Sequence, residues 1–186
     1  MPPKNKFTKE QVINQGIDII RKDGISGLTA RNIAKNLNAS PKVIFGLFLN
    51  MQDLQVQVIE ACYAYHLSYL KREMEKSTYP PYKMSGMAYV KFAKEEKEIF
   101  KLLFMSGKGN FIEAEKENNF VINALRECFN ISEENAKLFH LETWTFVHGI
   151  AVMIVSNQFD YSEELISTVL TDVFLGLKYR FSNREE

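Results

Sequence analysis

The hydrophobic positions between residues 28 and 48 follow two short helical repeats that a tight turn separates. Thr29 precedes the first repeat as an N-cap residue, and Ser40 precedes the second, where Pro41 then occupies the first helical position. Only residues 37–39 remain for the turn. Two helices joined this closely cross steeply, so the pattern predicts a helix-turn-helix whose second helix enters the major groove of duplex DNA.

The helical spacing continues along the rest of the chain, and no segment alternates with period two for long enough to indicate a strand. A first helix is expected over residues 8–23, where Thr8 and Gln11 form a capping box. A long helix is expected over residues 50–76, with Asn50 as its N-cap. The further helical patterns cover residues 84–97, 98–105, 111–129, 133–156 and 163–181.

These elements predict an all-α fold of about nine helices. Residues 1–49 form a three-helix DNA-binding head, and residues 50–186 form a helical ligand-binding and dimerisation body that the long fourth helix joins to the head. Although the whole chain has no net charge, residues 1–50 carry eight basic and three acidic side chains, a net +5, and the remainder carries −5. A basic head on an acidic body favours phosphate contacts at one end.

Cys62 and Cys128 lie inside apolar helical patterns, so both are expected to be buried, reduced thiols of a cytoplasmic protein. The N-terminal residues have charge but no apolar run behind them, which argues against a secretory signal. Residues 138–155 are long enough to span a bilayer but contain two histidines, a glutamate and two threonines, so no membrane partner is expected.

The third helix supplies the candidate groove contacts. Lys42, Val43 and Gly46 are expected on its groove-facing side, while Phe45 packs with its apolar neighbours; Lys42 as an ordinary surface charge is the alternative. Arg31 either approaches the DNA backbone or pairs with an acid of the first helix. The full candidate DNA-binding set is Lys6, Thr29, Arg31, Ser40, Pro41, Lys42, Val43, Phe45 and Gly46.

Aromatic residues at helical spacing in the body could line an apolar small-molecule cavity, although such residues are more often plain core. Trp144 and His148 lie four positions apart and so share a helix face. The candidate ligand residues are Tyr63, Phe92, Phe100, Phe104, Phe111, Phe120, Trp144, His148 and Met153.

The last helix carries a wide apolar stripe, and the helix before it is apolar nearly all round. Both either complete the core or pack against a second copy across a two-fold axis, and a homodimer is favoured because helix-turn-helix heads act in pairs. The candidate dimer residues are Leu165, Ile166, Val169, Leu170, Val173, Phe174 and Leu177.

No enzymatic signature is present in the sequence. A di-iron carboxylate bundle requires a glutamate three positions before a histidine. None of the three histidines has a glutamate at that position. There is also no phosphate-binding glycine loop, nucleophile elbow or CxxC pair. The chain is therefore not expected to be an enzyme or to hold a metal or cofactor.

Taken together, the motifs over residues 7–54 resemble the TetR family of transcriptional regulators. The body adds a weaker match at Trp144, His148 and Gly149. The matching residues of the head are Phe7-Thr8, Gly24, Leu28-Thr29-Ala30-Arg31, Ile33-Ala34-Lys35, Ser40, Phe45, Phe48, Asn50 and Asp53-Leu54.

The resemblance implies a dimeric repressor that leaves a near-palindromic double-stranded DNA operator when a small apolar ligand binds. Two positions depart from the family pattern. The family usually has a phosphate-contacting tyrosine where this chain has Phe45, and a lysine near Met51. Each loss weakens DNA binding without altering base choice. The alternative is a helical protein–protein adaptor, or a regulator with weakened DNA binding.

Overall fold

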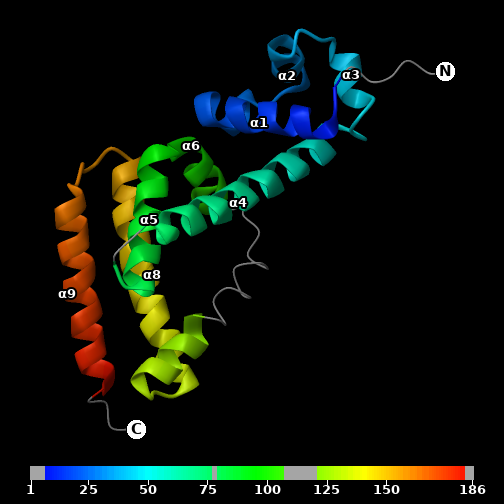
Figure 1. The fold of residues 1–186 in the computed structure, drawn as a ribbon. Helices are drawn as coiled ribbons and strands as arrows, with labels where there is room; N and C mark the ends of the chain where they lie inside the picture. Colours follow the sequence, from blue (N-terminus) through cyan, green and yellow to red (C-terminus); the bar gives the residue numbers. More distant parts are fainter. Residues whose placement is uncertain (1–6, 77–78, 107–120, 183–186) are drawn as a thin grey trace. The chain divides into compact units, whose positions relative to one another are not determined.

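The computed structural model describes residues 7–76, 79–106 and 121–182, and every regular element within these ranges is helical (Figure 1). This confirms the predicted all-α fold class. The chain divides into two compact units. Unit 1 comprises Met1–Ser68 and Glu96–Gly109, and unit 2 comprises Tyr69–Glu95 and Asn110–Glu186.

Unit 1 begins with α1, Lys9–Asp23, whose ends are set by local contacts. Thr8 Oγ1 accepts a hydrogen bond from the Gln11 backbone N–H (3.2 Å), and Gln11 Oε1 accepts one from the Thr8 N–H (2.9 Å). The predicted capping box is therefore confirmed. Gly24 ends the helix at a φ of +68°, which L side chains rarely adopt.

A short 3-10 turn, η1 (Ile25–Gly27), leads to the helix pair that the sequence predicts. The pair consists of α2, Ala30–Asn36, and α3, Pro41–Phe45, and α2 packs against both α1 and α3. In the turn between them, Asn38 has a φ of +49°, a left-handed conformation that asparagine tolerates better than most residues. The turn thus joins α2 to α3 within four residues, and α3 packs against α2.

The long helix α4 runs over Met51–Glu75. Asn50 Oδ1 accepts a hydrogen bond from the Asp53 N–H, and Asp53 Oδ2 accepts one from the Leu49 N–H, both at 2.9 Å. This reciprocal cap fixes the start of α4. The boundary between the compact units crosses α4 after Ser68. The predicted boundary at residue 50 separates a DNA-binding domain from a ligand-binding domain, whereas the two compact units are separated by their packing. The predicted boundary therefore stays a prediction.

The single helix expected over residues 98–105 is two elements. The first is α6, Lys97–Phe100, which packs against α1, and the second is a π-helical turn, η2, Lys101–Met105. The side chains of Ile99 and Phe100 are fully buried. A π turn keeps nearly the same apolar spacing as an α-helical turn over so short a run, so the sequence pattern alone does not distinguish them.

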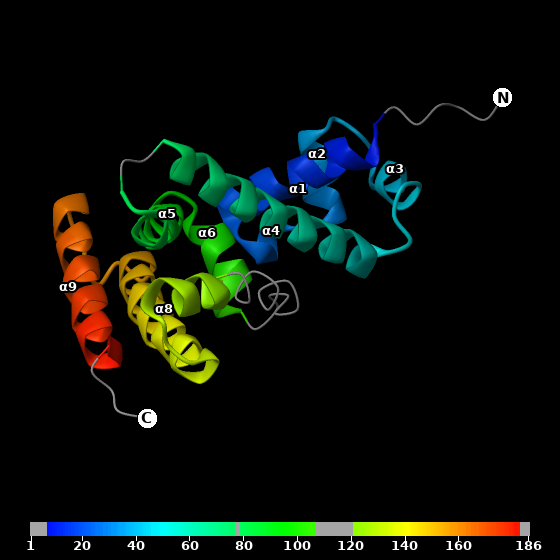
Figure 2. The same ribbon diagram turned by 60° about the horizontal axis from the view of Figure 1, so that its bottom comes forward.

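Unit 2 is built from three long helices that pack on one another (Figure 2). They are α5, Pro81–Glu95; α8, Glu133–Val155; and α9, Glu163–Ser182. The predicted start of α5 was residue 84, whereas Pro81 is its first residue, a position where proline's missing N–H costs nothing. Residues 121–129 are also helical. The core cluster at this end of unit 2 consists of Ile122, Leu125, Ala136, Phe139 and Phe181.

The two cysteines differ in exposure. Cys62 is buried as expected, and burial raises the pKa of its thiol to about 12. Cys128 is exposed, which corrects the prediction that both would be buried. The buried positions of its helix are Ile122 and Leu125, and Phe129 continues that face, so Cys128 falls beside it.

Helix α8 is long and apolar enough to cross a membrane when judged by length and composition alone, a test that the core helix of a water-soluble protein also passes. Eight of its residues are buried within the chain, among them Phe139, Val147 and Ile150. Leu141 and Trp144 are exposed instead, at 56% and 44%. The helix therefore presents a second apolar surface, which residues 7–76, 79–106 and 121–182 leave exposed.

Candidate nucleic-acid interface and the polar contacts behind it

One face of α3 is buried against the rest of unit 1, and the other, which we call the open face, is exposed to solvent. Ile44 is fully buried and Phe48, four positions later, is 3% exposed. Of the three predicted groove-facing residues, Lys42 and Gly46 are exposed and Val43 is half-buried; Pro41 is exposed as well. The two buried aromatic and aliphatic anchors thus fix which side of this short helix faces solvent.

Phe45 does not pack as the sequence analysis expected. Its side chain is 50% exposed, because Ile44 and Phe48 already fill the inward side of α3. A five-residue helix has room for one buried stripe only, and Phe45 falls next to Pro41 and Lys42 on the opposite side. The phenylalanine therefore belongs to the open surface.

The cap residues behave differently. Thr29 Oγ1 accepts a hydrogen bond from the Asn32 backbone N–H at 3.2 Å, so α2 has the predicted side-chain cap. Ser40 occupies the N-cap position of α3 with extended backbone, but its side chain makes no capping hydrogen bond. The predicted position of Ser40 is right and its predicted side-chain contact is not formed.

The helix pair α2 and α3 carries three exposed basic side chains. Arg31, Lys35 and Lys42 are exposed, and none of them forms an ion pair within the described ranges 7–76, 79–106 and 121–182. Of the two alternatives for Arg31, pairing with an acid of α1 is thus not observed in these ranges. The guanidinium that pairs with α1 is Arg21, whose Nη1 lies 2.8 Å from Asp18 Oδ1. Lys6 lies outside the described residues.

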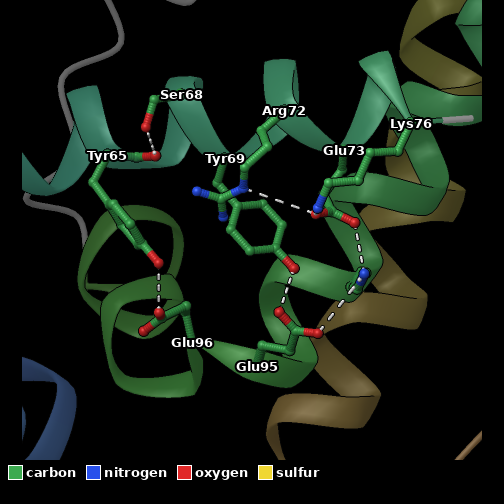
Figure 3. A network of polar contacts seen from close by, with 9 residues as sticks. Tyr65, Ser68, Tyr69, Arg72, Glu73, Lys76, Glu95 and Glu96 are labelled. Atoms are coloured by element: carbon green, nitrogen blue, oxygen red, sulfur yellow. Dashed lines mark hydrogen bonds and ion pairs between the residues drawn. The ribbon is translucent and has the colours of Figure 1, made fainter.

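Behind the head, Glu96 joins three helices of unit 1. The side chain of Glu96 is only 10% exposed; its Oε2 accepts a hydrogen bond from Arg21 Nε at 2.8 Å, and its Oε1 accepts one from Tyr65 Oη at 2.7 Å. The Arg21 guanidinium also lies over the Tyr65 ring, 5.4 Å from its centroid. Figure 3 shows the Tyr65–Glu96 contact. We call Arg21, Tyr65 and Glu96 the Glu96 cluster.

Glu96 stabilises the protonated forms of both Arg21 and Tyr65. The hydrogen bond with Glu96 is the main cause that raises the pKa of Arg21, and burial followed by the same carboxylate raises the pKa of Tyr65. Both groups therefore keep their protons at any physiological pH. Sequence spacing gives no sign of this cluster, because Arg21 and Glu96 are 75 residues apart.

Unit 2 has a polar cluster of its own, centred on Glu73 (Figure 3). The Glu73 carboxylate accepts hydrogen bonds from Lys76 Nζ at 2.8 Å and Lys91 Nζ at 2.6 Å. These two bonds lower the pKa of Glu73 to about 2. Nearby, Tyr69 Oη donates to Glu95 at 2.5 Å. The cluster ties the last turns of α4 to α5.

The predicted ligand residues fall in both units. In unit 1, Tyr63 and Phe100 are buried, and Phe104 meets the buried His66 edge to face at 5.1 Å. Burial lowers the pKa of His66 to about 4, so its imidazole is neutral near pH 7. His66 is not among the predicted ligand residues, although it lies on α4 between them.

In unit 2, Phe92 is fully buried beside Tyr69, whereas Trp144 and Met153 are exposed at 44% and 38%. The Trp144 indole stacks on the His148 imidazole with 4.8 Å between centroids and 8° between planes, as their four-residue spacing allows. Tyr89 Oη lies 3.0 Å from His148 Nδ1. Phe111 and Phe120 lie outside the described residues.

The predicted dimer residues divide into two groups. Ile166 and Leu170 are 6% and 7% exposed, and Phe174 and Leu177 pack against the core cluster of unit 2, so these four serve the chain's own core. Val169 and Val173 are half-buried, and Leu165 is 47% exposed. Four exposed apolar side chains of α8 and α9 are not among the predicted site residues: Leu141, Phe146, Leu175 and Tyr179.

No group of three or more metal-ligating side chains comes together in the part of the chain that the structure describes.

A search of family models and a search of curated proteins find no match to this chain, whereas solved structures match over nearly its whole length. A protein of unknown function from Rhodococcus sp. RHA1 is 19% identical with a TM-score of 0.76, over 96% of this chain and all of that one. A protein from Pseudomonas aeruginosa PAO1 that is assigned as a transcriptional regulator is 13% identical with a TM-score of 0.69, over 93% of each chain.

The multidrug-binding protein EbrR, solved in complex with imidazole, is 16% identical with a TM-score of 0.59, over 89% of this chain and 93% of that one. The Pseudomonas protein and EbrR both have TetR-like folds. At these identities the comparisons establish the fold, and the chain has a TetR-like fold.

Proposed function

We propose that this chain is a TetR-like DNA-binding transcriptional regulator, a repressor that leaves a near-palindromic operator when a small apolar ligand binds. The observation that carries the proposal is the open face of α3, where Pro41, Lys42 and Gly46 are exposed while Ile44 anchors the opposite side. The net +5 charge of residues 1–50 favours the same partner, since phosphate contacts dominate DNA affinity. The fold shared with an assigned transcriptional regulator supports it.

The regulator acts as a cytoplasmic homodimer in this proposal. Two heads that read successive major grooves on one side of the duplex sit roughly 34–36 Å apart, or a multiple of that. The second copy would cover the exposed apolar side chains of α8 and α9, which include Leu141, Trp144, Leu165, Leu175 and Tyr179. Sedimentation at micromolar concentration should give twice 21.5 kDa. A Leu141→Glu/Trp144→Glu variant should sediment as a monomer, and a wild-type monomer would contradict the dimer.

Ligand control would pass through unit 1. A small apolar molecule beside Tyr63, His66 and Phe104 would displace α4 or α6 and so disturb the Glu96 cluster, which holds α1 through Arg21. The coupling free energy that such a response needs is typically ~1–3 kcal/mol. The multidrug-binding neighbour EbrR, solved with imidazole, supports a small-molecule response in this fold.

Gel-shift binding to DNA upstream of the chain's own gene, measured across salt concentrations, tests the proposal. Affinity should fall steeply with salt, and Lys42→Glu should weaken binding to every bound fragment. Lys71→Glu is the matched control, because Lys71 is an exposed lysine of α4 in unit 2 and should leave affinity unchanged. Absent or salt-independent binding to every fragment would refute the DNA-binding role and favour a protein–protein adaptor.

A further inference from the structure

The open face of α3 is nearly without polar side chains. Pro41 and Phe45 lie one turn apart on it, with Lys42 and Gly46 beside them. Between residues 40 and 49, Lys42 and Ser40 carry the only polar side chains. Because Phe45 is 50% exposed and Ile44 fully buried, the aromatic ring belongs to the surface that the helix offers to a partner.

This composition limits how the helix can read bases. Guanine is read through two hydrogen bonds from arginine or lysine, and adenine through two from asparagine or glutamine. The face offers a single lysine and no guanidinium or amide group. The one base-edge group in the major groove that an apolar side chain recognises is the 5-methyl group of thymine.

Two of the neighbouring amides are engaged within the head. Asn50 is engaged as the cap of α4 through the Asp53 N–H, and Asn32 donates to the Gly27 carbonyl at 2.9 Å. Asn38 lies in the turn before α3 and so outside the helix itself. On α3 itself, the apolar pair of Pro41 and Phe45 is therefore left to meet the base edges.

We propose that Phe45, together with Pro41, is a specificity-determining residue that reads thymine 5-methyl groups in each operator half-site, next to a guanine contacted by Lys42. The proposal rests on the proposed DNA-binding function. It predicts thymine-rich half-sites whose recognition depends on methyl contact more than on hydrogen bonds to the bases.

The test begins by selecting duplexes from a random library with the full chain. A selected duplex is then compared with one in which deoxyuridine replaces the thymidines of both half-sites, a change that removes only the methyl groups. Burial of one methyl corresponds to about a fourfold change in affinity, so one contact in each half-site corresponds to about a fifteenfold loss. Wild type should show that loss on the deoxyuridine duplex.

Phe45→Ala should bind the thymidine duplex about as weakly as wild type binds the deoxyuridine one, and should no longer distinguish the two. Phe159→Ala is the matched control, since Phe159 is 54% exposed in unit 2 and its removal should leave the discrimination intact. Lys42→Ala should lower affinity for both duplexes and keep their ratio. The mutated side chains are exposed, so each variant should fold, and circular dichroism checks that it does.

Two failures are distinguishable. If wild type binds selected DNA in a salt-dependent way but equally with thymidine and deoxyuridine, or if Phe45→Ala keeps the full discrimination, the thymine assignment is wrong and the DNA-binding function stands. If the library yields no bound duplex at all, the proposed function itself fails.

Discussion

Replacement of Glu96 by glutamine isolates the charge at the centre of the Glu96 cluster, because the amide keeps the shape of the carboxylate. The native carboxylate accepts hydrogen bonds from Arg21 Nε and Tyr65 Oη, at 2.8 and 2.7 Å, with only 10% of its side chain exposed. Glutamine retains one acceptor oxygen and has no charge, so one of the two donors loses its acceptor and neither keeps a charged partner.

The magnitude follows from these contacts. A hydrogen bond to a charged group contributes about 1.5–3 kcal/mol to stability. The Arg21 side chain is 40% exposed and can regain water, which places the expected loss for Glu96→Gln at the lower end, about 1.5–2 kcal/mol. For a chain of this size such a loss lowers Tm by roughly 3–8 °C.

A double-mutant cycle measured by urea unfolding separates the interaction from the side effects of each substitution. We expect Arg21→Met and Glu96→Gln to show a coupling energy of about 1–2 kcal/mol. The control cycle is Lys94→Met with Asp160→Asn, an ion pair of 2.6 Å whose side chains are 50% and 84% exposed. Exposed pairs of this kind contribute about 0–1 kcal/mol.

A coupling energy between Arg21 and Glu96 no larger than that of the control pair would refute the reasoning, since burial of the carboxylate would then add nothing. If the coupling is large and the proposed ligand response is correct, Glu96→Gln should also weaken operator binding, because the contact that holds α1 through Arg21 is lost. The two readouts are independent, so the structural prediction can hold where the regulatory one fails.

Three further predictions concern single sites. The pKa of His66 is about 4 in the folded chain and near 6.5 in the unfolded chain. Between these values the unfolded chain binds more protons, so the free energy of unfolding falls on acidification. His66→Phe should remove about 2 kcal/mol of the loss that urea unfolding measures between about pH 7 and about pH 5. In α1, a Cβ at Gly16 would lie 2.8 Å from Val58 Cγ2, so Gly16→Ala should lower the free energy of unfolding by about 1 kcal/mol or more. Gly176 has open space around it, so Gly176→Ala should raise the free energy of unfolding by about 0.5–1 kcal/mol. Thermal unfolding measures both, and equal effects would contradict this prediction. Met51→Lys should restore one phosphate contact and steepen the slope of log affinity against log salt by about 0.9, and an unchanged slope would place residue 51 away from the DNA.

The helix ends could be predicted because they are local. The capping box at Thr8, the stop at Gly24 and the caps at Thr29 and Asn50 each depend on residues no more than four positions apart, and all four are observed. Helical spacing over fifteen or more residues also fixes the inward face, as in α1.

The exposure of Phe45 could not be predicted in the same way. Ile44 and Phe45 are adjacent apolar residues in a helix of five, and only packing against the rest of unit 1 decides which one turns inward. The exposure of Cys128 escaped prediction for a related reason: an apolar stripe has a width, and the neighbouring helices decide which residues at its edges are buried.

The Glu96 cluster could not be predicted from the sequence pattern, because its members come together only through tertiary packing. Its arrangement nevertheless follows from the positions of two tyrosines and two glutamates. Tyr65 and Tyr69 lie one turn apart on α4, and the consecutive acids Glu95 and Glu96 stand where α5 ends and α6 begins. Each tyrosine donates to one acid, and the unit boundary passes between the two pairs, so each unit holds one complete Tyr–Glu contact. A substitution at Glu96 therefore perturbs unit 1 directly, and this is why its effect on DNA binding is an informative measure of how firmly the head is held.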